Sequence, residues 1–323
     1  MRSRQRLSER QWCLALTVTI KGNETRSGET PWLLNRIAYK HMETGDDGRL
    51  AAAETRAFYL EELNKQEKWE EEQKDLWFWE KLGRLPFVLL DKVTPAFIQE
   101  KLAVAINELG SYIQTGGQYL ISDKSILQRF GAQGTEAEKG QDLTVADIKG
   151  LPLLKMDEVA GEIRASRVNF ATLQGATTGI GGIFTLAIDV PMLLGLSLKV
   201  LQEIALCYGY DPRDKAERIF IVKCLQFSSS DIVGKKAILD ELTAYQDHAS
   251  GNQMISQLQG WREVVMTYRD NFGWKKLFQI IPVAGMLFGA FLNRSTVEDV
   301  AEAGMMLYRK RRILERLKED HRE

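Results

Sequence analysis

The segment from residue 168 to residue 198 holds 31 residues with a single formal charge, Asp189. Four glycines lie in its first half: Gly175, Gly179, Gly181 and Gly182. The first two have the spacing Gly-x-x-x-Gly. Each glycine inside a helix costs about 1 kcal/mol relative to alanine, so the four together cost about 4 kcal/mol. Residues four apart share one face of a helix, and close packing of a second helix on that face can offset this cost. We therefore expect the glycine face to pack against another helix, in a protein core or in lipid.

We interpret this segment as a hairpin of two helices. The sequence Asp189-Val190-Pro191 separates two apolar halves, and we place the break there because proline interrupts a helix. The second leg ends at Tyr208-Gly209, where glycine suits the left-handed residue that closes many helices. Each leg is about 30 Å long at 1.5 Å per residue, enough to cross a bilayer or to fill a domain core. A buried Asp189 would be costly and is a candidate for chemistry, but the simpler interpretation is a cap on the second leg at the hairpin tip.

A second charge-poor run covers the 17 residues 277–293 and contains another Gly-x-x-x-Gly pair, Gly285 and Gly289. Its length is at the short limit for a helix that spans a bilayer. The spacing of Ser295 and Glu298 is that of a capping box, which predicts that a new helix begins there. We expect the two charge-poor segments to lie together and to form one apolar surface or core.

The last expected helix carries four consecutive basic residues: Arg309, Lys310, Arg311 and Arg312. The simpler interpretation is a solvated helix surface. The alternative is contact with anionic lipid head groups on the cytoplasmic side of a membrane, together with Arg294. Acidic residues in the same helix, Glu315 and Glu319 among them, weaken the lipid alternative.

The chain from residue 51 onward favours helices, because apolar residues recur at intervals of three and four and only seven prolines occur in 323 residues. We predict an all-α domain over residues 51–323, a helical bundle built around the glycine-rich hairpin, with no sheet of three or more strands. Residues 122–150 contain glycines among polar residues and predict a loop.

Residues 1–50 differ from the rest of the chain. Residues 22–48 are rich in Gly, Thr, Glu and Asp, a composition that is typical of disorder. We expect an N-terminal extension that is either poorly ordered or the product of an upstream start, with Met42 as the alternative start.

Composition and motifs exclude several classes of protein. The 43 basic and 44 acidic residues give a formal net charge of −1, whereas nucleic-acid-binding proteins are usually basic. An apolar fraction of 44% and a mean hydropathy of −0.25 exclude a polytopic membrane protein. The three cysteines lie far apart and the three histidines lack metal-ligand spacing, so we assign no disulfide, metal or cofactor.

Motifs of nucleotide-binding loops and of serine hydrolases are also missing from the sequence. The run Ser228-Ser229-Ser230 predicts a loop before the next helix, with Ser230 or Asp231 as its cap, in preference to a nucleophile. We assign no catalytic residue.

Two stretches of the chain resemble the EcsC family. The first lies within residues 169–231 and reads GATTGIGGIFTLAIDVPMLLGLSLKVLQEIALCYGYD, followed by a capped helix. The second reads IPVAGMLFGAFLN and precedes a helix that contains Tyr308-Arg309, while residues 79–119 fit the start of the family. The resemblance covers residues 70–317.

The family takes its name from a bacterial protein encoded beside the ATPase and membrane subunits of an ABC transport system. The resemblance therefore implies a link to transport and supplies no catalytic residue. The hairpin is also similar to an apolar helical domain attached to some bacterial GTPases, which implies membrane contact.

Three functional hypotheses follow. The favoured one is a non-enzymatic, membrane-associated helical protein that is an accessory to an ABC transport or secretion system. It would be cytoplasmic and attached peripherally to the inner face of the cell membrane, with membrane lipid and an ABC transporter membrane subunit as partners. The alternative is a soluble helical module that binds a lipid or another apolar ligand. The third is a hydrolase that uses Asp189 with Gln202, Glu203 or Asn169. The sequence indicates no oligomeric state.

Overall fold

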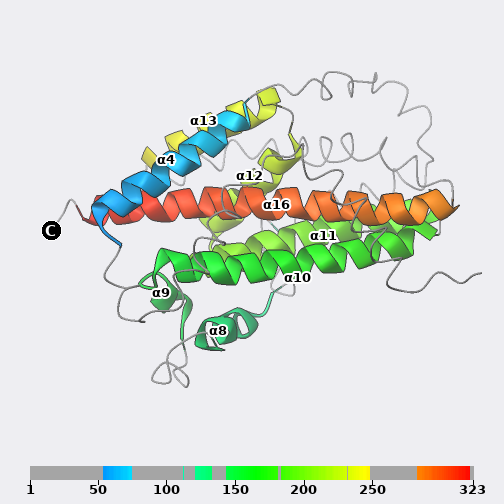
Figure 1. Cartoon of the computed structure of the whole chain (residues 1–323), viewed down its shortest axis with the longest axis horizontal. Helices are drawn as coiled ribbons and strands as arrows, with labels where there is room; N and C mark the ends of the chain where they lie inside the picture. Colours follow the sequence, from blue (N-terminus) through cyan, green and yellow to red (C-terminus); the bar gives the residue numbers. More distant parts are fainter. Residues whose placement is uncertain are drawn as a thin grey trace, which may run out of the picture. The chain divides into compact units, whose positions relative to one another are not determined.

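The computed structural model describes residues 54–74, 112, 121–132, 143–180, 183–230, 232–247 and 282–320. Every regular element in these ranges is a helix, which confirms the predicted all-α class (Figure 1). The helices are α4 (Arg56–Glu72), α8 (Asp123–Ala132), α9 (Val145–Ile148), α10 (Leu153–Ile180), α11 (Ile183–Cys207), α12 (Lys215–Ser229), α13 (Ile232–Asp247) and α16 (Pro282–Glu319). The predicted extension, residues 1–50, and residues 79–119 apart from Tyr112 lie outside the described residues.

Helices α10, α11 and α16 run side by side and contact one another (Figure 1). Helix α16 has 38 residues and is therefore about 57 Å long at 1.5 Å per residue. Helix α10 is antiparallel to α16. Near its start, Asp157 pairs with Arg309 close to the end of α16, and near its end Gly175 meets Gly289 close to the start of α16. Helices α4 and α12 also pack on α16.

The C-terminal half of α11 lies in the core. Val200, Leu201 and Ile204 are fully buried. A Cβ atom placed on Gly304 of α16 would lie 2.7 Å from Leu201 Cδ2, so the glycine lets the two helices approach closely. Because α10, α12 and α16 all contact α11, this part of the hairpin's second leg is covered by protein.

The hairpin turn lies earlier in the chain than predicted. Helix α10 ends at Ile180 and α11 begins at Ile183, so the connection falls at Gly181 and Gly182, which are outside the described residues. The predicted break and cap at Asp189 are wrong, because α11 continues through Asp189 and Pro191. A proline in a helix interior costs about 3 kcal/mol and two glycines about 2 kcal/mol, so local propensity alone does not account for this outcome.

The end of the hairpin's second leg is confirmed. Gly209 has a φ of 76°, the left-handed region that glycine adopts without strain. The Gly209 N–H donates to the Leu206 carbonyl at 2.9 Å and the Tyr210 N–H donates to the Ala205 carbonyl at 2.9 Å. This pair of bonds is the Schellman motif that closes helices.

The predicted helix start at Ser295 is wrong, because α16 is continuous from Pro282 to Glu319. The Glu298 side chain accepts a hydrogen bond from Arg164 of α10 at 3.1 Å, and this contact replaces the expected capping box. Val297 and Val300 are buried on either side of Glu298, so packing holds the helix together through the capping sequence.

The loop predicted over residues 122–150 contains helical structure. Helix α8 buries Ile126 and Phe130, and the short helix α9 buries Ile148. The few buried apolar residues of this region are too widely spaced to show a helical period. The sequence pattern therefore did not indicate these helices. Residues 133–142 between the two helices are outside the described residues.

Candidate functional site

The first notable site is a crossing of α10 and α16 at two glycines. A Cβ atom on Gly175 would lie 2.6 Å from the Gly289 carbonyl carbon, still closer to its oxygen, and 2.9 Å from Asn293 Cβ. Backbone therefore meets backbone, and no side chain larger than hydrogen fits at Gly175. The structure thus brings together one glycine from each charge-poor segment.

The other predicted packing residues cannot be placed in the same way. The side-chain surroundings of the following residues lie outside the described part of the chain: Gly179, Gly181, Gly182, Asp189, Pro191 and Gly285.

Several large apolar side chains are exposed on the two helices that carry these glycines and on α11. Leu173 and Phe291 lie two residues from Gly175 and Gly289 respectively, and each is 65% exposed. Phe170 of α10 is 51% exposed and Met192 of α11 is 46% exposed. We call Phe170, Leu173, Met192 and Phe291 the apolar end. Of the described side chains, the remaining exposed large apolar residue is Leu60 on α4.

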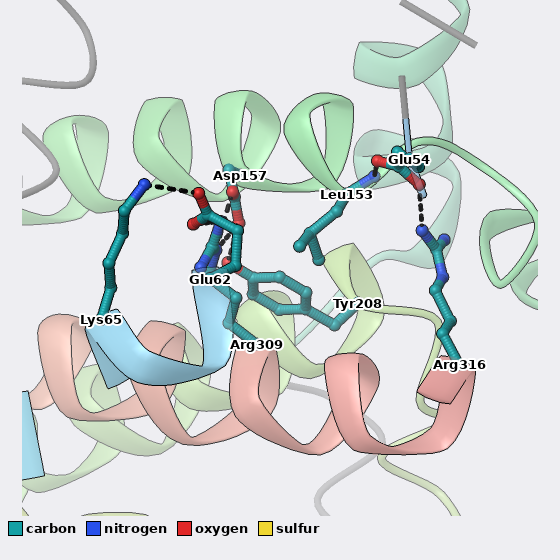
Figure 2. A network of polar contacts seen from close by, with 8 residues as sticks. All are labelled: Glu54, Glu62, Lys65, Leu153, Asp157, Tyr208, Arg309 and Arg316. Atoms are coloured by element: carbon teal, nitrogen blue, oxygen red, sulfur yellow. Dashed lines mark hydrogen bonds and ion pairs between the residues drawn. The ribbon is translucent and has the colours of Figure 1, made fainter. Parts of the chain in front are cut away.

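A buried ionic cluster lies toward the C-terminal part of α16 (Figure 2). Arg309 donates from Nε to Asp157 Oδ2 at 2.8 Å and from Nη2 to Glu62 Oε2 at 2.7 Å. The Tyr208 hydroxyl donates to Asp157 Oδ1 at 2.7 Å, and Lys65 Nζ donates to Glu62 Oε1 at 2.7 Å. We call these five residues the ionic cluster. It joins α4, α10, the end of α11 and α16 around one guanidinium.

Burial and charge oppose each other in this cluster. Burial works against the charged form of Arg309, but Asp157 and Glu62 hold its pKa above the ordinary arginine value. Burial raises the pKa of Asp157, and Arg309 counteracts this only in part. Burial would also raise the pKa of Glu62, but Arg309 and Lys65 outweigh it and hold that pKa below 4.5, its usual value. The cluster is thus built to keep Arg309 paired inside the protein.

The lowered pKa of Glu62 predicts a pH effect on stability. Its stabilising contribution is present above 4.5, the usual pKa, and is lost as the pH falls through the lower pKa of the folded state. Asp157, whose pKa is raised, has the opposite dependence. We therefore compare urea unfolding of the wild type and Glu62→Gln, and expect their difference in unfolding free energy to shrink below about pH 4.5. A difference that stays constant from neutral pH to about pH 3 would contradict the pairing of Glu62.

The run of four basic residues in α16 is paired within the protein. Lys310 Nζ donates to both oxygens of Glu70 at 2.8 Å, and Arg311 contacts Glu217 at 2.7 Å. Arg312 donates twice to the Tyr208 carbonyl, at 3.1 and 2.6 Å.

The predicted solvated surface is therefore wrong for these residues. Four consecutive residues point around the whole circumference of a helix, and α16 has a neighbour in each direction here. Contact with a lipid head group would first require that a carboxylate partner leave.

The residues considered for hydrolysis do not form a site in the described part of the chain. Glu203 is 3% exposed at its side chain and its carboxylate binds Arg167, with Nε to Oε2 at 2.6 Å. Asn169 is exposed, and the side chain of Asp189 is outside the described residues. Glu203 is thus held in an ion pair with Arg167.

The serine run closes helix α12 and is not the predicted loop. Ser228 and Ser229 belong to its last turn, and both hydroxyls donate to the Leu225 carbonyl at 2.8 Å. Ser230 is the C-cap and donates to the Gln226 carbonyl at 2.7 Å. Hydroxyls bonded to their own helix in this way are structural. Within the described residues, no three His, Cys, Asp or Glu side chains are grouped to hold a metal ion.

The family model of the EcsC protein family matches residues 60–313. This chain belongs to the EcsC protein family. The match confirms the resemblance and spans the apolar end, the glycine crossing and the ionic cluster. None of the EcsC helices described here is both long and apolar enough to cross a membrane.

Two relatives from Bacillus subtilis (strain 168) are similar to this EcsC chain. One, "Uncharacterized protein YdbA", is 59% identical over 263 residues, which cover 81% of this chain and 96% of the relative. The other, "Protein EcsC", is 28% identical over 169 residues, which cover 52% of this chain and 69% of the relative. No solved structure matches this chain.

Proposed function

We propose that this EcsC protein is a non-enzymatic, membrane-associated helical protein that attaches to the inner face of the cell membrane by its apolar end. The observation that carries the proposal is the exposure of four large apolar side chains, Phe170, Leu173, Met192 and Phe291. Phe170 and Leu173, three residues apart, are neighbours on one face of α10. Single exposed apolar residues are common on protein surfaces, but a group of large ones is typical of an interaction site.

Charge around the apolar end supports attachment to a membrane. Arg294 lies three residues after Phe291, its side chain is 53% exposed, and its Nε lies 3.7 Å from Glu298 Oε2. Residues three apart on a helix are neighbours, so a cation accompanies an exposed aromatic ring. Apolar side chains with a nearby cation suit the boundary between acyl chains and anionic head groups.

The partner and process follow from the family resemblance and are part of the same proposal. We propose a role as an accessory to an ABC transport or secretion system, with a membrane subunit of the transporter as the protein partner. The packed bundle supports an accessory role, because its exposed apolar side chains can contact lipid or a membrane protein without a spanning helix.

The test is flotation of the purified protein with lipid vesicles. We expect Leu173→Ser and Phe291→Ser each to lower vesicle binding by about ten-fold, because a leucine or phenylalanine that leaves water contributes about 1.5–3 kcal/mol. Leu60→Ser is the matched control: Leu60 is 48% exposed but lies on α4, away from the crossing, so its replacement should leave binding unchanged.

Equal loss of binding in all three variants would contradict the assignment of the apolar end. Recovery of the wild-type protein in the soluble fraction of broken cells, with no vesicle binding, would favour the alternative of a soluble module that binds an apolar ligand.

A further inference from the structure

Helix α4 is held on the bundle by a face that mixes aromatic packing, such as Trp69 against Phe227, with many polar contacts. Its buried side chains are Tyr59, Glu62, Gln66 and Trp69. Even the aromatic members make polar contacts: the Trp69 indole N–H donates to Glu302 at 2.9 Å, and the Tyr59 hydroxyl is bonded to Glu54 and Arg316. By contrast, α11 packs on α16 through aliphatic side chains and Gly304.

Charge complementarity explains how such a helix docks. Helix α4 has six glutamates and three basic residues, a net charge of −3, and Glu54 precedes it. Residues 309–316 of α16 have five basic residues and one glutamate, a net charge of +4. The carboxylates of Glu54, Glu62 and Glu70 each bind one cation of α16.

The five cations of residues 309–316 divide into two groups. Arg311 and Arg312 are bound to Glu217 and to the Tyr208 carbonyl, which belong to the body of the bundle. The other group consists of those that α4 covers: Arg309, Lys310 and Arg316. We call this second group the cationic stripe.

We propose that α4 is an autoinhibitory latch, whose glutamates occupy the cationic stripe until an anionic lipid surface displaces them. A phosphate group of a lipid presents the same paired oxygens that Glu70 presents to Lys310. Ion pairs with lipid phosphates would replace those that the cations lose when α4 leaves, whereas aliphatic packing would have no such substitute. The inference deepens the proposed membrane association, because it says what controls a second contact with the bilayer.

Release of α4 would leave the body of the bundle intact. Arg309 would keep Asp157, and Arg316 would keep the carbonyls of Lys149 and Leu151. Lys310 would exchange Glu70 for a head group. Helix α16 has the apolar Phe291 near one end and the cationic stripe near the other, so it could then lie along the membrane surface.

The experiment measures binding to vesicles of phosphatidylglycerol and of phosphatidylcholine, together with hydrogen exchange of the α4 amides. Phosphatidylglycerol should speed exchange over residues 56–72, and phosphatidylcholine should not. Glu70→Gln weakens the latch and should raise binding to phosphatidylglycerol about five-fold, since a lysine near an anionic surface contributes about 1 kcal/mol.

Glu71→Gln is the matched control, because it removes the same charge from an adjacent, exposed position. Its binding to phosphatidylglycerol should change less than about two-fold. The double variant Glu70→Lys with Lys310→Glu reverses the ion pair, which restores the latch but removes a cation from the cationic stripe. Its binding to phosphatidylglycerol should therefore not exceed that of the wild type.

Equal binding by Glu70→Gln and Glu71→Gln would overturn the latch, as would α4 amide exchange that phosphatidylglycerol leaves unchanged. The two proposals can fail separately. If Leu173→Ser binds vesicles normally while α4 responds to phosphatidylglycerol, the apolar end is wrong and the latch stands. If Leu173→Ser loses binding while α4 does not respond, the latch is wrong and the apolar end stands.

Discussion

Replacement of Arg309 by methionine is expected to destabilise the protein by about 3–5 kcal/mol. The variant leaves the buried Glu62 and the partly buried Asp157 without their shared cation, and removing one partner of a buried ion pair costs far more than the pair itself contributes. Urea unfolding at neutral pH, followed by circular dichroism, measures the loss.

Arg56→Met is the control for loss of an arginine. The Arg56–Asp320 pair is exposed, with side chains 42% and 55% accessible, so the variant should lose no more than about 1 kcal/mol. Adding Asp157→Asn and Glu62→Gln to Arg309→Met removes the stranded charges and should recover part of the loss. If Arg309→Met lowers the unfolding free energy as little as Arg56→Met does, the charges of the ionic cluster are solvated and not buried.

Substitution of alanine for glycine should have opposite effects at two positions of α10. Gly175→Ala places a methyl group against the Gly289 carbonyl, so the helices must separate at a cost of about 1–3 kcal/mol. Gly161→Ala meets open space, with no atom within 4 Å of the new carbon, and should stabilise the helix by up to about 1 kcal/mol.

Both variants change the same residue type in the same helix, so helix propensity cancels in the comparison. In thermal unfolding, Gly175→Ala should have a lower melting temperature than the wild type and Gly161→Ala a higher one. Stabilisation by both substitutions would mean that α10 and α16 do not meet at the glycine crossing in solution.

Local patterns in the sequence were sufficient for some features of this fold. The run of apolar residues at helical spacing predicted the all-α class, and Gly209 marked the end of α11 because a left-handed residue favours glycine. The cost of glycine in a helix predicted a close approach at Gly175. None of these inferences depends on knowing which distant segment is the neighbour.

Features that depend on distant partners could not be predicted. Ser295 and Glu298 have the spacing of a capping box, but Glu298 accepts a hydrogen bond from Arg164, which lies 134 residues earlier in the chain. The cations of residues 309–312 were predicted to be solvated because their partners come from distant parts of the chain, namely α4, α10, α12 and the end of α11. The place of the hairpin turn depended on the balance between Pro191 and two adjacent glycines, which propensity alone did not resolve.

The continuity of α16 has a consequence for how the chain can vary in length. Gly289 and Arg309 are 20 positions apart on one uninterrupted helix, about 30 Å at 1.5 Å per residue. An extra residue between them would turn one relative to the other by about 100°, because a helix has 3.6 residues per turn. Gly289 could then no longer face Gly175 while Arg309 faces Asp157. The spacing of these two residues therefore acts as a phase relation, which a single inserted residue would break.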